Sequence, residues 1–338
     1  MHDLSKLPVI DIGPLVEAGA NPAPAADAIG EACRAAGFFY VVGHGIDPQL
    51  VERLDRLSRA FFGLDHETKM AICMERGGRA WRGYFPVGSE LTSGKPDQKE
   101  GLYFGAELGP EHPEVRAGTP LHGRNLFPEL EGFGETVLAY LDALTALGHR
   151  LMEGIALSLR LPRQHFSARL TRDPLVLFRI FHYPPLTREQ TAELWSVGEH
   201  TDYGLLTILL QDRAGGLQVK AGGRWIDAPP IEGSFVCNLG DMLDRMTGGR
   251  YRSTPHRVLN TSGRSRLSYP FFFDPGWNAE IEPIPGGLAR GEAAADAAER
   301  WDRASPHLFE GTYGEYLLRK VGKVFPDLES AVLKQDSP

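Results

Sequence analysis

The sequence predicts an α+β protein built around a β-sandwich or jelly roll, and three observations support that fold class. The 338 residues include 39 glycines and 25 prolines, well above the average share of roughly 12% for these two residues together. Short apolar segments separated by turn residues fill the second half of the chain, which is typical of sandwiches and jelly rolls. One long amphipathic pattern lies in the middle of the chain. Long-helix bundles and coiled coils are therefore disfavoured folds for this chain.

The N-terminal part is predicted to alternate between strands and helices. Residues 7–12 (LPVIDI) alternate and carry β-branched side chains, which favours a short strand. Residues 25–36 place Ala, Ile and Cys on one face of a helix that begins after Pro24 and ends at Gly37. The run at 38–42 (FFYVV) is wholly apolar and too short for a helix, so we expect a buried strand.

The middle of the chain is predicted to hold two helices around a loop-rich stretch. Residues 51–62 carry apolar side chains at helical spacing. Between 75 and 125 the chain is rich in Gly, Pro and charge, so we expect loops with short strands, one of them at 101–104. The pattern at 130–161 is the longest helical one, and Pro162 marks its end. Such a helix usually lies across a sheet.

From residue 175 onward the apolar period changes to two, the period of half-buried strands. The strands expected here are 175–183, 205–211, 217–220, 224–228, 234–239, 256–260 and 266–273. Ala221-Gly222-Gly223 separates two of them and predicts a hairpin. The tail at 303–332 is expected to be helical.

Composition and charge limit the classes of binding partner and the cellular compartment that we expect for this protein. The formal net charge is −8 and no run of Lys or Arg exceeds two residues, so we expect neither nucleic acid nor a membrane surface as partner. The three cysteines, Cys33, Cys73 and Cys237, are far apart, which favours reduced thiols in the cytoplasm. We expect no secretory signal and no membrane helix, because no apolar segment of sufficient length occurs.

A candidate metal site lies between residues 200 and 256. His200 and Asp202 are two residues apart, so on a strand they would share a face, and His256 begins a separate predicted strand. Two imidazoles and one carboxylate on one face of a divalent metal leave positions open, the arrangement of non-haem Fe(II) oxygenases. The alternative is that each His is an ordinary surface or hydrogen-bonded residue, because a His-x-Asp pair is common by chance.

A candidate anion site follows on the last predicted strand. Arg266 and Ser268 share a strand face, and the guanidinium offers a planar pair of donors that suits a carboxylate. The residues around Arg266 are apolar, so burial with an anionic ligand is the preferred interpretation. A surface arginine in a salt bridge is the alternative.

Several motifs occur together and in a characteristic order. They are LPVIDI, GFFYVVGHGI, FFGLDHETK, EHTDYGLLTILLQD, GGLQVKAGGRWIDAPP, GDMLDRMTGGRYRSTPHRV and RLSYPFFFDP. Together they span roughly residues 7 to 280, and they resemble the isopenicillin N synthase-like branch of the Fe(II)/2-oxoglutarate-dependent dioxygenases. The resemblance implies a double-stranded β-helix (jelly-roll) core with an N-terminal α/β region and flanking helices. We expect one integrated domain over 1–338, comprising an N-terminal dioxygenase-type region at 7–115, a catalytic core at 173–278 and C-terminal helices at 303–332.

The resemblance also implies roles for individual residues. It implies iron held by His200, Asp202 and His256. It further implies that Arg266, Ser268 and Tyr183 bind the far carboxylate region of 2-oxoglutarate.

This chain departs from the family near Tyr183, and its N-terminal region offers further candidates. The family often has Asn-Tyr-Tyr-Pro where this chain has Phe181-His182-Tyr183-Pro184, so the Asn contact to the co-substrate is missing. His182 would lie on the opposite strand face, in a packing or surface role.

Arg79 and Arg82 lie in the region that borders the substrate opening in relatives, where each is either a contact for a substrate carboxylate or a solvated side chain.

The function expected from these residues is a non-haem Fe(II)/2-oxoglutarate-dependent oxygenase. It would use Fe(II), 2-oxoglutarate as co-substrate and O2 to oxidise an unidentified small molecule, releasing succinate and CO2. One alternative is a 2-oxoglutarate-independent Fe(II) oxidase resembling isopenicillin N synthase, in which the same Arg-x-Ser pair holds a substrate carboxylate. The other is a β-helix binding or sensor protein without turnover.

Overall fold

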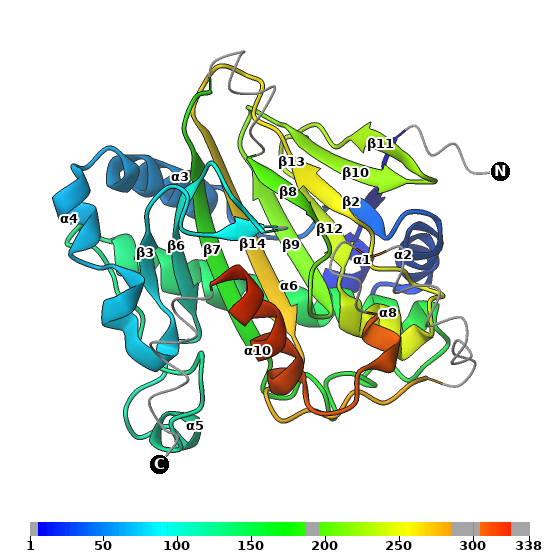
Figure 1. Ribbon diagram of the computed structural model, residues 1–338. Coiled ribbons are helices and arrows are strands. Elements are labelled where there is room, and N and C mark those ends of the chain that lie inside the picture. The colour runs from blue at the N-terminus through cyan, green and yellow to red at the C-terminus, as the bar shows by residue number, and fades with distance from the viewer. Residues whose placement is uncertain (1–5, 93, 187–195, 285–299, 301–304, 326–338) are drawn as a thin grey trace.

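Two β-sheets of unequal size form the core of the protein (Figure 1). The computed structural model describes residues 6–92, 94–186, 196–284, 300 and 305–325. The larger sheet has the order β1 (Val9–Asp11), β2 (Phe38–Val42), β12 (Phe235–Leu239), β9 (Leu206–Gln211), β14 (Arg266–Asp274), β7 (Leu175–Tyr183), β6 (Glu100–Gly105) and β3 (Gly83–Phe85). Its neighbouring strands pair antiparallel, apart from β1 with β2.

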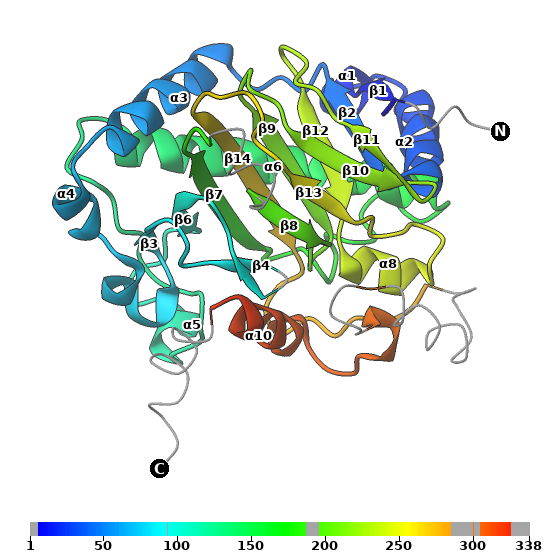
Figure 2. The same cartoon turned by 45° about the horizontal axis from the view of Figure 1, so that its top comes forward.

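The smaller sheet lies over the middle of the larger one, as Figure 2 shows. Its order is β11 (Arg224–Asp227), β10 (Leu217–Ala221), β13 (His256–Val258) and β8 (Val197–His200). The predicted hairpin between β10 and β11 is confirmed, with Gly222 and Gly223 at φ 55° and 77°, the left-handed conformation that a two-residue turn requires. A separate short ribbon pairs β4 (Leu91–Thr92) with β5 (Lys95–Pro96). The jelly-roll core expected from the sequence is present.

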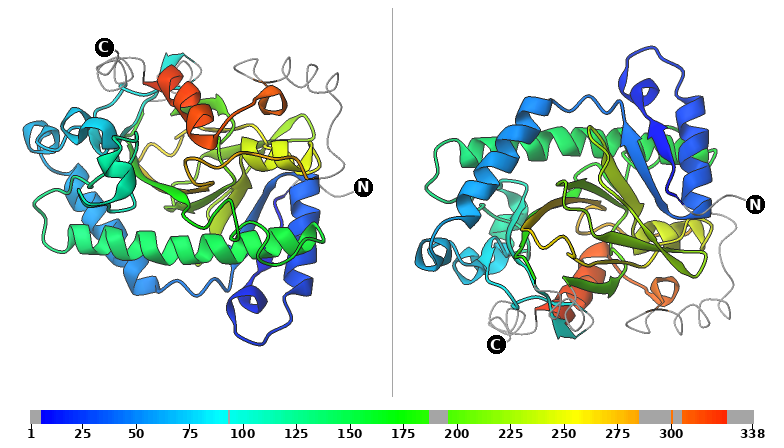
Figure 3. Two further views of the ribbon diagram at one scale, coloured as in Figure 1. Left: turned by 90° about the horizontal axis from the view of Figure 1, so that it is seen from below. Right: turned by 90° about the horizontal axis from the view of Figure 1, so that it is seen from above.

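One long helix braces the outer face of the larger sheet, as Figure 3 shows. This helix, α6 (Phe133–Ser158), contacts α2 (Ala23–Ala35), α3 (Pro48–Phe62) and strands of the larger sheet. Gly148 of α6 lies so close to the sheet that a Cβ atom there would stand 2.5 Å from the ring of Phe273. The helix is shorter than the predicted 130–161, since it ends at Ser158 and Arg160 has a left-handed φ of 60°.

The remaining helices are short and lie around the sheets. They are α1 (Gly13–Val16), α4 (His66–Met70), the 3-10 helix η1 (Met74–Ala80), α5 (Pro113–Arg116), α8 (Asp241–Thr247), the 3-10 helix η2 (Pro306–Leu308) and α10 (Tyr313–Val324). The predicted C-terminal helices at 303–332 correspond to η2 and α10, while 303–304 and 326–332 lie outside the described residues. Helix α8 was not predicted, because seven residues are too few to display a helical period. Within the described ranges, no helix has the length and apolar character needed to cross a bilayer.

Candidate metal and co-substrate site

Three side chains with metal-binding atoms meet between the two sheets. His200 is the last residue of β8 and His256 the first of β13, and the antiparallel register sets these two residues opposite each other. Asp202 lies in the loop that follows β8. One ligand atom from each of the three residues lies within 4.8 Å of the others. The local arrangement is therefore set by the pairing of two strands that are more than fifty residues apart in sequence.

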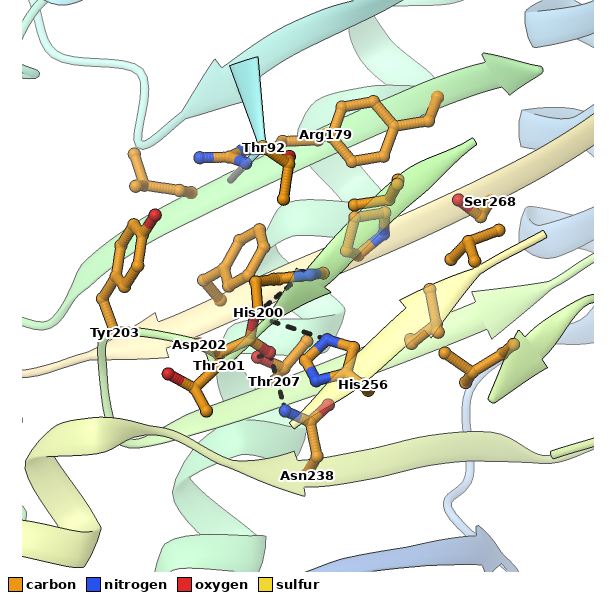
Figure 4. A pocket seen from close by; sticks show the side chains of 18 of the residues that line it. Thr92, Arg179, His200, Thr201, Asp202, Tyr203, Thr207, Asn238, His256 and Ser268 are labelled. Carbon is orange, nitrogen blue, oxygen red and sulfur yellow. Dashed lines mark hydrogen bonds and ion pairs between the residues drawn. The ribbon is translucent and has the colours of Figure 1, made fainter. Parts of the chain in front are cut away.

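Asp202 is oriented by hydrogen bonds and not by strand alternation. His200 and Asp202 do not lie on one strand, because β8 ends at His200. Instead, Oδ2 of Asp202 accepts hydrogen bonds from the hydroxyl of Thr207 and from Nδ2 of Asn238 (2.6 Å). These bonds leave Oδ1 at 3.9 Å from Nε2 of His200 and 3.8 Å from Nε2 of His256 (Figure 4).

The two orienting residues come from the larger sheet and were missed in the sequence. Thr207 lies on β9 and Asn238 on β12. Asn238 is a polar residue within the apolar run FVCNL, and its side chain is almost fully buried. Buried polar groups need hydrogen-bond partners. A single Asn in an apolar strand therefore indicated a polar partner inside the core, although this signal was not used in predicting the site.

Both imidazoles present a free Nε2 to the centre of the group. Nδ1 of His200 lies 2.8 Å from the carbonyl oxygen of Gly198, and Nδ1 of His256 lies 3.3 Å from that of Thr254. Such contacts to the second nitrogen fix the tautomer that exposes Nε2. Burial lowers the pKa of His200, and burial together with the neighbouring His200 lowers that of His256 to about 4.

The charge state of the group suits a divalent cation. Burial on its own would raise the pKa of Asp202, but the charge of the two imidazoles when they are protonated, together with its two hydrogen bonds, outweighs burial and lowers it. Two neutral imidazoles and one carboxylate are the donor set of a non-haem iron site with open positions. These residues therefore fit Fe(II).

A buried guanidinium lies in the same cavity. Arg266 of β14 is opposite Tyr183 of β7, and its guanidinium carbon lies 4.6 Å from the centre of the Tyr183 ring. Nε donates to the carbonyl oxygen of Gly215 (2.6 Å), whereas Nη1 has no hydrogen-bond partner among the described residues. Ser268 donates from its hydroxyl to that of Tyr183 at 3.4 Å. Because an unpartnered buried donor is unfavourable, this end of the cavity fits an anionic ligand.

Phe181, which stands where the family often has Asn, packs among other aromatic side chains. Phe181 lines the cavity and contacts the rings of Phe85 and Tyr103, and Nζ of Lys99 lies 4.8 Å from its ring. His182 faces the other way, as predicted: its Nδ1 lies 2.7 Å from Oε1 of Glu100 and it is not part of the cavity wall.

The cavity wall also holds polar residues that the sequence did not indicate. They are Glu90, Thr92, Lys99, Arg179, Tyr203 and Asp274. Neither Arg79 nor Arg82 lines this cavity. Arg79 donates to the carbonyl oxygen of Gly118, and Arg82 is 1% exposed and donates to that of Leu121, so a solvated Arg82 is wrong.

Comparisons with known proteins agree with this geometry. Residues 7–130 match the family model of the non-haem dioxygenase in morphine synthesis N-terminal region, and residues 174–275 match the 2OG-Fe(II) oxygenase superfamily. A probable iron/ascorbate oxidoreductase of Dictyostelium discoideum is 54% identical over 98% of each chain. A homoarginine-6-hydroxylase of Arabidopsis thaliana is 35% identical over 94% of this chain and 97% of its own. A full-length Neurospora crassa protein, crystallised in complex with alpha-KG, is 29% identical, with a TM-score of 0.77 over 95% of this chain and 98% of that one.

Proposed function

The chain belongs to the Fe(II)/2-oxoglutarate-dependent dioxygenases, and from this premise we propose that His200, Asp202 and His256 hold its iron. The protein is a non-haem oxygenase that oxidises a small molecule. The observation that supports the proposed ligands is the convergence of three free ligand atoms within 4.8 Å, in a cavity that also holds the unpartnered Nη1 of Arg266.

The same proposal assigns the co-substrate site. Arg266 and Ser268 would bind the far carboxylate of 2-oxoglutarate, and Tyr183 would complete this end of the cavity through its hydroxyl. A bidentate pair between the guanidinium and the carboxylate would satisfy the nitrogen that has no partner. The Neurospora crassa structure with alpha-KG supports this choice of ligand.

The chain's own residues position the reactants and exclude water. When bound, Fe(II) supplies the activation of O2 that couples conversion of 2-oxoglutarate to succinate and CO2 with oxidation of the substrate. Thr207 and Asn238 hold Asp202 with one oxygen toward the metal position. The apolar side chains of Leu209, Leu217 and Val258 line the cavity and keep it dry.

We propose a cytoplasmic location because two of the cysteines are free thiols in the core of the protein. Cys33 and Cys237 are both buried and free. Burial, followed by the nearby Cys33, raises the pKa of the Cys237 thiol. Two buried thiols close to each other and unlinked are expected in a reducing compartment.

The test is anaerobic calorimetry of 2-oxoglutarate binding to the Fe(II)-loaded protein, followed by assay of succinate release when O2 is admitted. We expect Asp202→Ala to abolish Fe(II) binding, and Arg266→Leu to raise the Kd for 2-oxoglutarate at least about 30-fold, as loss of a buried charge pair does. Arg264→Leu is the matched control, because Arg264 is exposed on the same chain segment. Failure of the wild-type Fe(II) protein to bind 2-oxoglutarate contradicts the proposal and favours the 2-oxoglutarate-independent oxidase.

A further inference from the structure

We propose that Arg179 binds a carboxylate of the substrate, so that the substrate is a small carboxylic acid with an apolar carbon skeleton. This inference rests on the function proposed above and adds a substrate class to it. Four observations carry it: the position of Arg179, its incomplete pairing, the chemistry of its guanidinium and the apolar residues in the wall of the same cavity.

Arg179 lies on the inner face of β7, away from the co-substrate residues. Leu177, Arg179, Phe181 and Tyr183 alternate along the strand, and all four line the cavity. Tyr183 lies four positions along the strand from Arg179, a distance of roughly 13 Å. In Figure 4 Arg179 lies above His200 on the side of Tyr203, whereas Ser268 lies on the opposite side of the metal group. A co-substrate bound at Arg266 therefore leaves Arg179 available to the substrate.

The guanidinium of Arg179 is partly buried, with the side chain 16% exposed, and it is incompletely paired. Its Nη1 lies 3.5 Å from Oε1 of Glu90. That carboxylate is shared, because its Oε1 also accepts from the Tyr103 hydroxyl (2.9 Å) and its Oε2 lies 2.9 Å from Nζ of Lys99. Nε of Arg179 is buried and has no hydrogen-bond partner in the described part of the chain. The rings of Tyr103 and Phe272 lie 4.3 and 4.8 Å from its guanidinium carbon and hold it in place.

Arg179 and Arg266 are the two arginines found in the wall of this cavity, as far as the described residues reach. Each has a guanidinium nitrogen without a hydrogen-bond partner. Lys99, in contrast, contacts the carboxylates of both Asp97 and Glu90. The cavity thus contains two guanidinium groups, each with a nitrogen that can donate a further hydrogen bond. The proposed binding of 2-oxoglutarate uses Arg266 and leaves Arg179.

A carboxylate is the acceptor that these surroundings favour. A guanidinium pairs with it through two parallel hydrogen bonds, whereas a neutral carbonyl engages fewer donors. A dianionic phosphate would meet repulsion from Glu90 and Asp202, both of which act electrostatically on Arg179. The cavity wall also has apolar members, among them Leu177 of β7 and Leu317 and Val324 of α10. This wall suits the carbon skeleton of the acid.

The test compares matched acids and amides as substrates. Hexanoate and L-norleucine, with hexanamide and L-norleucinamide, are added to the Fe(II) protein with 2-oxoglutarate and O2, and succinate release above the substrate-free rate is measured. We expect the acids to stimulate release and the amides to have little effect. Arg179→Gln should raise the half-saturating concentration of an acid at least about 30-fold, and Arg179→Lys, which keeps the charge, should restore part of the loss.

Arg224→Gln, an exposed arginine on β11, is the matched control and should behave as the wild type. Binding of 2-oxoglutarate to each Fe(II)-loaded variant is measured in parallel, and Arg179→Gln should retain it. Equal responses to acid and amide in the wild type would overturn the inference, as would an unchanged acid preference in Arg179→Gln or no response to either acid at millimolar concentration. A wild-type protein that does not bind 2-oxoglutarate would instead contradict the proposed function.

Discussion

Asn238 donates a hydrogen bond from Nδ2 to Oδ2 of Asp202 at 2.6 Å. The donor lies on the larger sheet, whereas the acceptor follows β8, an edge strand of the smaller sheet. The bond therefore ties the two sheets together at the metal group and leaves the other oxygen of Asp202 toward His200 and His256. Hydrogen-bond partners of this kind orient metal ligands, and their loss commonly weakens metal binding about 10- to 100-fold.

Thr207 supports the same carboxylate, so its hydroxyl should contribute to metal affinity. Thr207→Val removes the donor to Oδ2 of Asp202 with little change of shape. We expect the Kd for Fe(II) to rise about 10- to 100-fold, measured by anaerobic titration. Thr207→Ser keeps the hydroxyl and should stay close to the wild type. Equal affinity in the Val and Ser variants would show that Asp202 does not depend on this bond.

The Tyr183 hydroxyl should contribute modestly to co-substrate binding. Tyr183→Phe keeps the ring beside Arg266 and removes the oxygen that accepts from Ser268. We expect the Kd for 2-oxoglutarate to rise about fivefold, the equivalent of one hydrogen bond, with Fe(II) affinity unchanged. Tyr269→Phe is the control, because its hydroxyl donates to Asp55 outside the cavity. The same loss in both variants would point to a general change in the paired strands β7 and β14.

Asp274 should make the stability of the metal-free protein depend on pH. Burial raises its pKa from 3.8 to about 7, although hydrogen bonds from Tyr313 and Leu205 act in the opposite direction. Between these two pH values the folded state binds more protons than the unfolded state. The contribution of Asp274 to the free energy of unfolding is therefore fully present below about pH 4, and it is lost as the pH rises through 7. The full effect is on the order of 4 kcal/mol.

Asp274→Asn removes this titration and should reduce the difference in unfolding free energy between pH 5 and pH 8 by a few kcal/mol. Urea denaturation of the chelator-treated protein at both pH values measures it. The exposed Asp227→Asn is the control and should leave the pH dependence as it is. A wild-type difference that persists in Asp274→Asn would assign the titration to another group.

The close approach of α6 to β14 predicts an unusual response to a helix-favouring substitution. Gly148→Ala should add up to about 1 kcal/mol of helix propensity, but its Cβ would stand 2.5 Å from the Phe273 ring. Overpacking of this kind costs about 1–3 kcal/mol, so we expect a net loss of stability in urea denaturation. Phe273→Leu in the same chain should recover part of that loss. A more stable Gly148→Ala protein would mean that the helix can shift away from the sheet.

The sequence by itself determined most of the strands and the chemistry of their residue types, although it did not indicate β8, the strand that carries His200. The period of two located β7 and β14 within one residue, and it assigned Phe181 and His182 to opposite faces. These features are local, because alternation and turn residues act over a few positions. The motifs likewise identified His200, Asp202 and His256 as a candidate group without any knowledge of their distances.

Only the tertiary structure decided what surrounds those residues. Alternation says which face of a strand a side chain occupies, but it does not say which sheet or loop covers that face. For this reason the roles of Thr207 and Asn238 beside Asp202 became visible only when the two sheets were brought together. The same holds for Arg179, whose strand position was evident, whereas its shared carboxylate and unpartnered Nε depend on Glu90, which is remote in sequence.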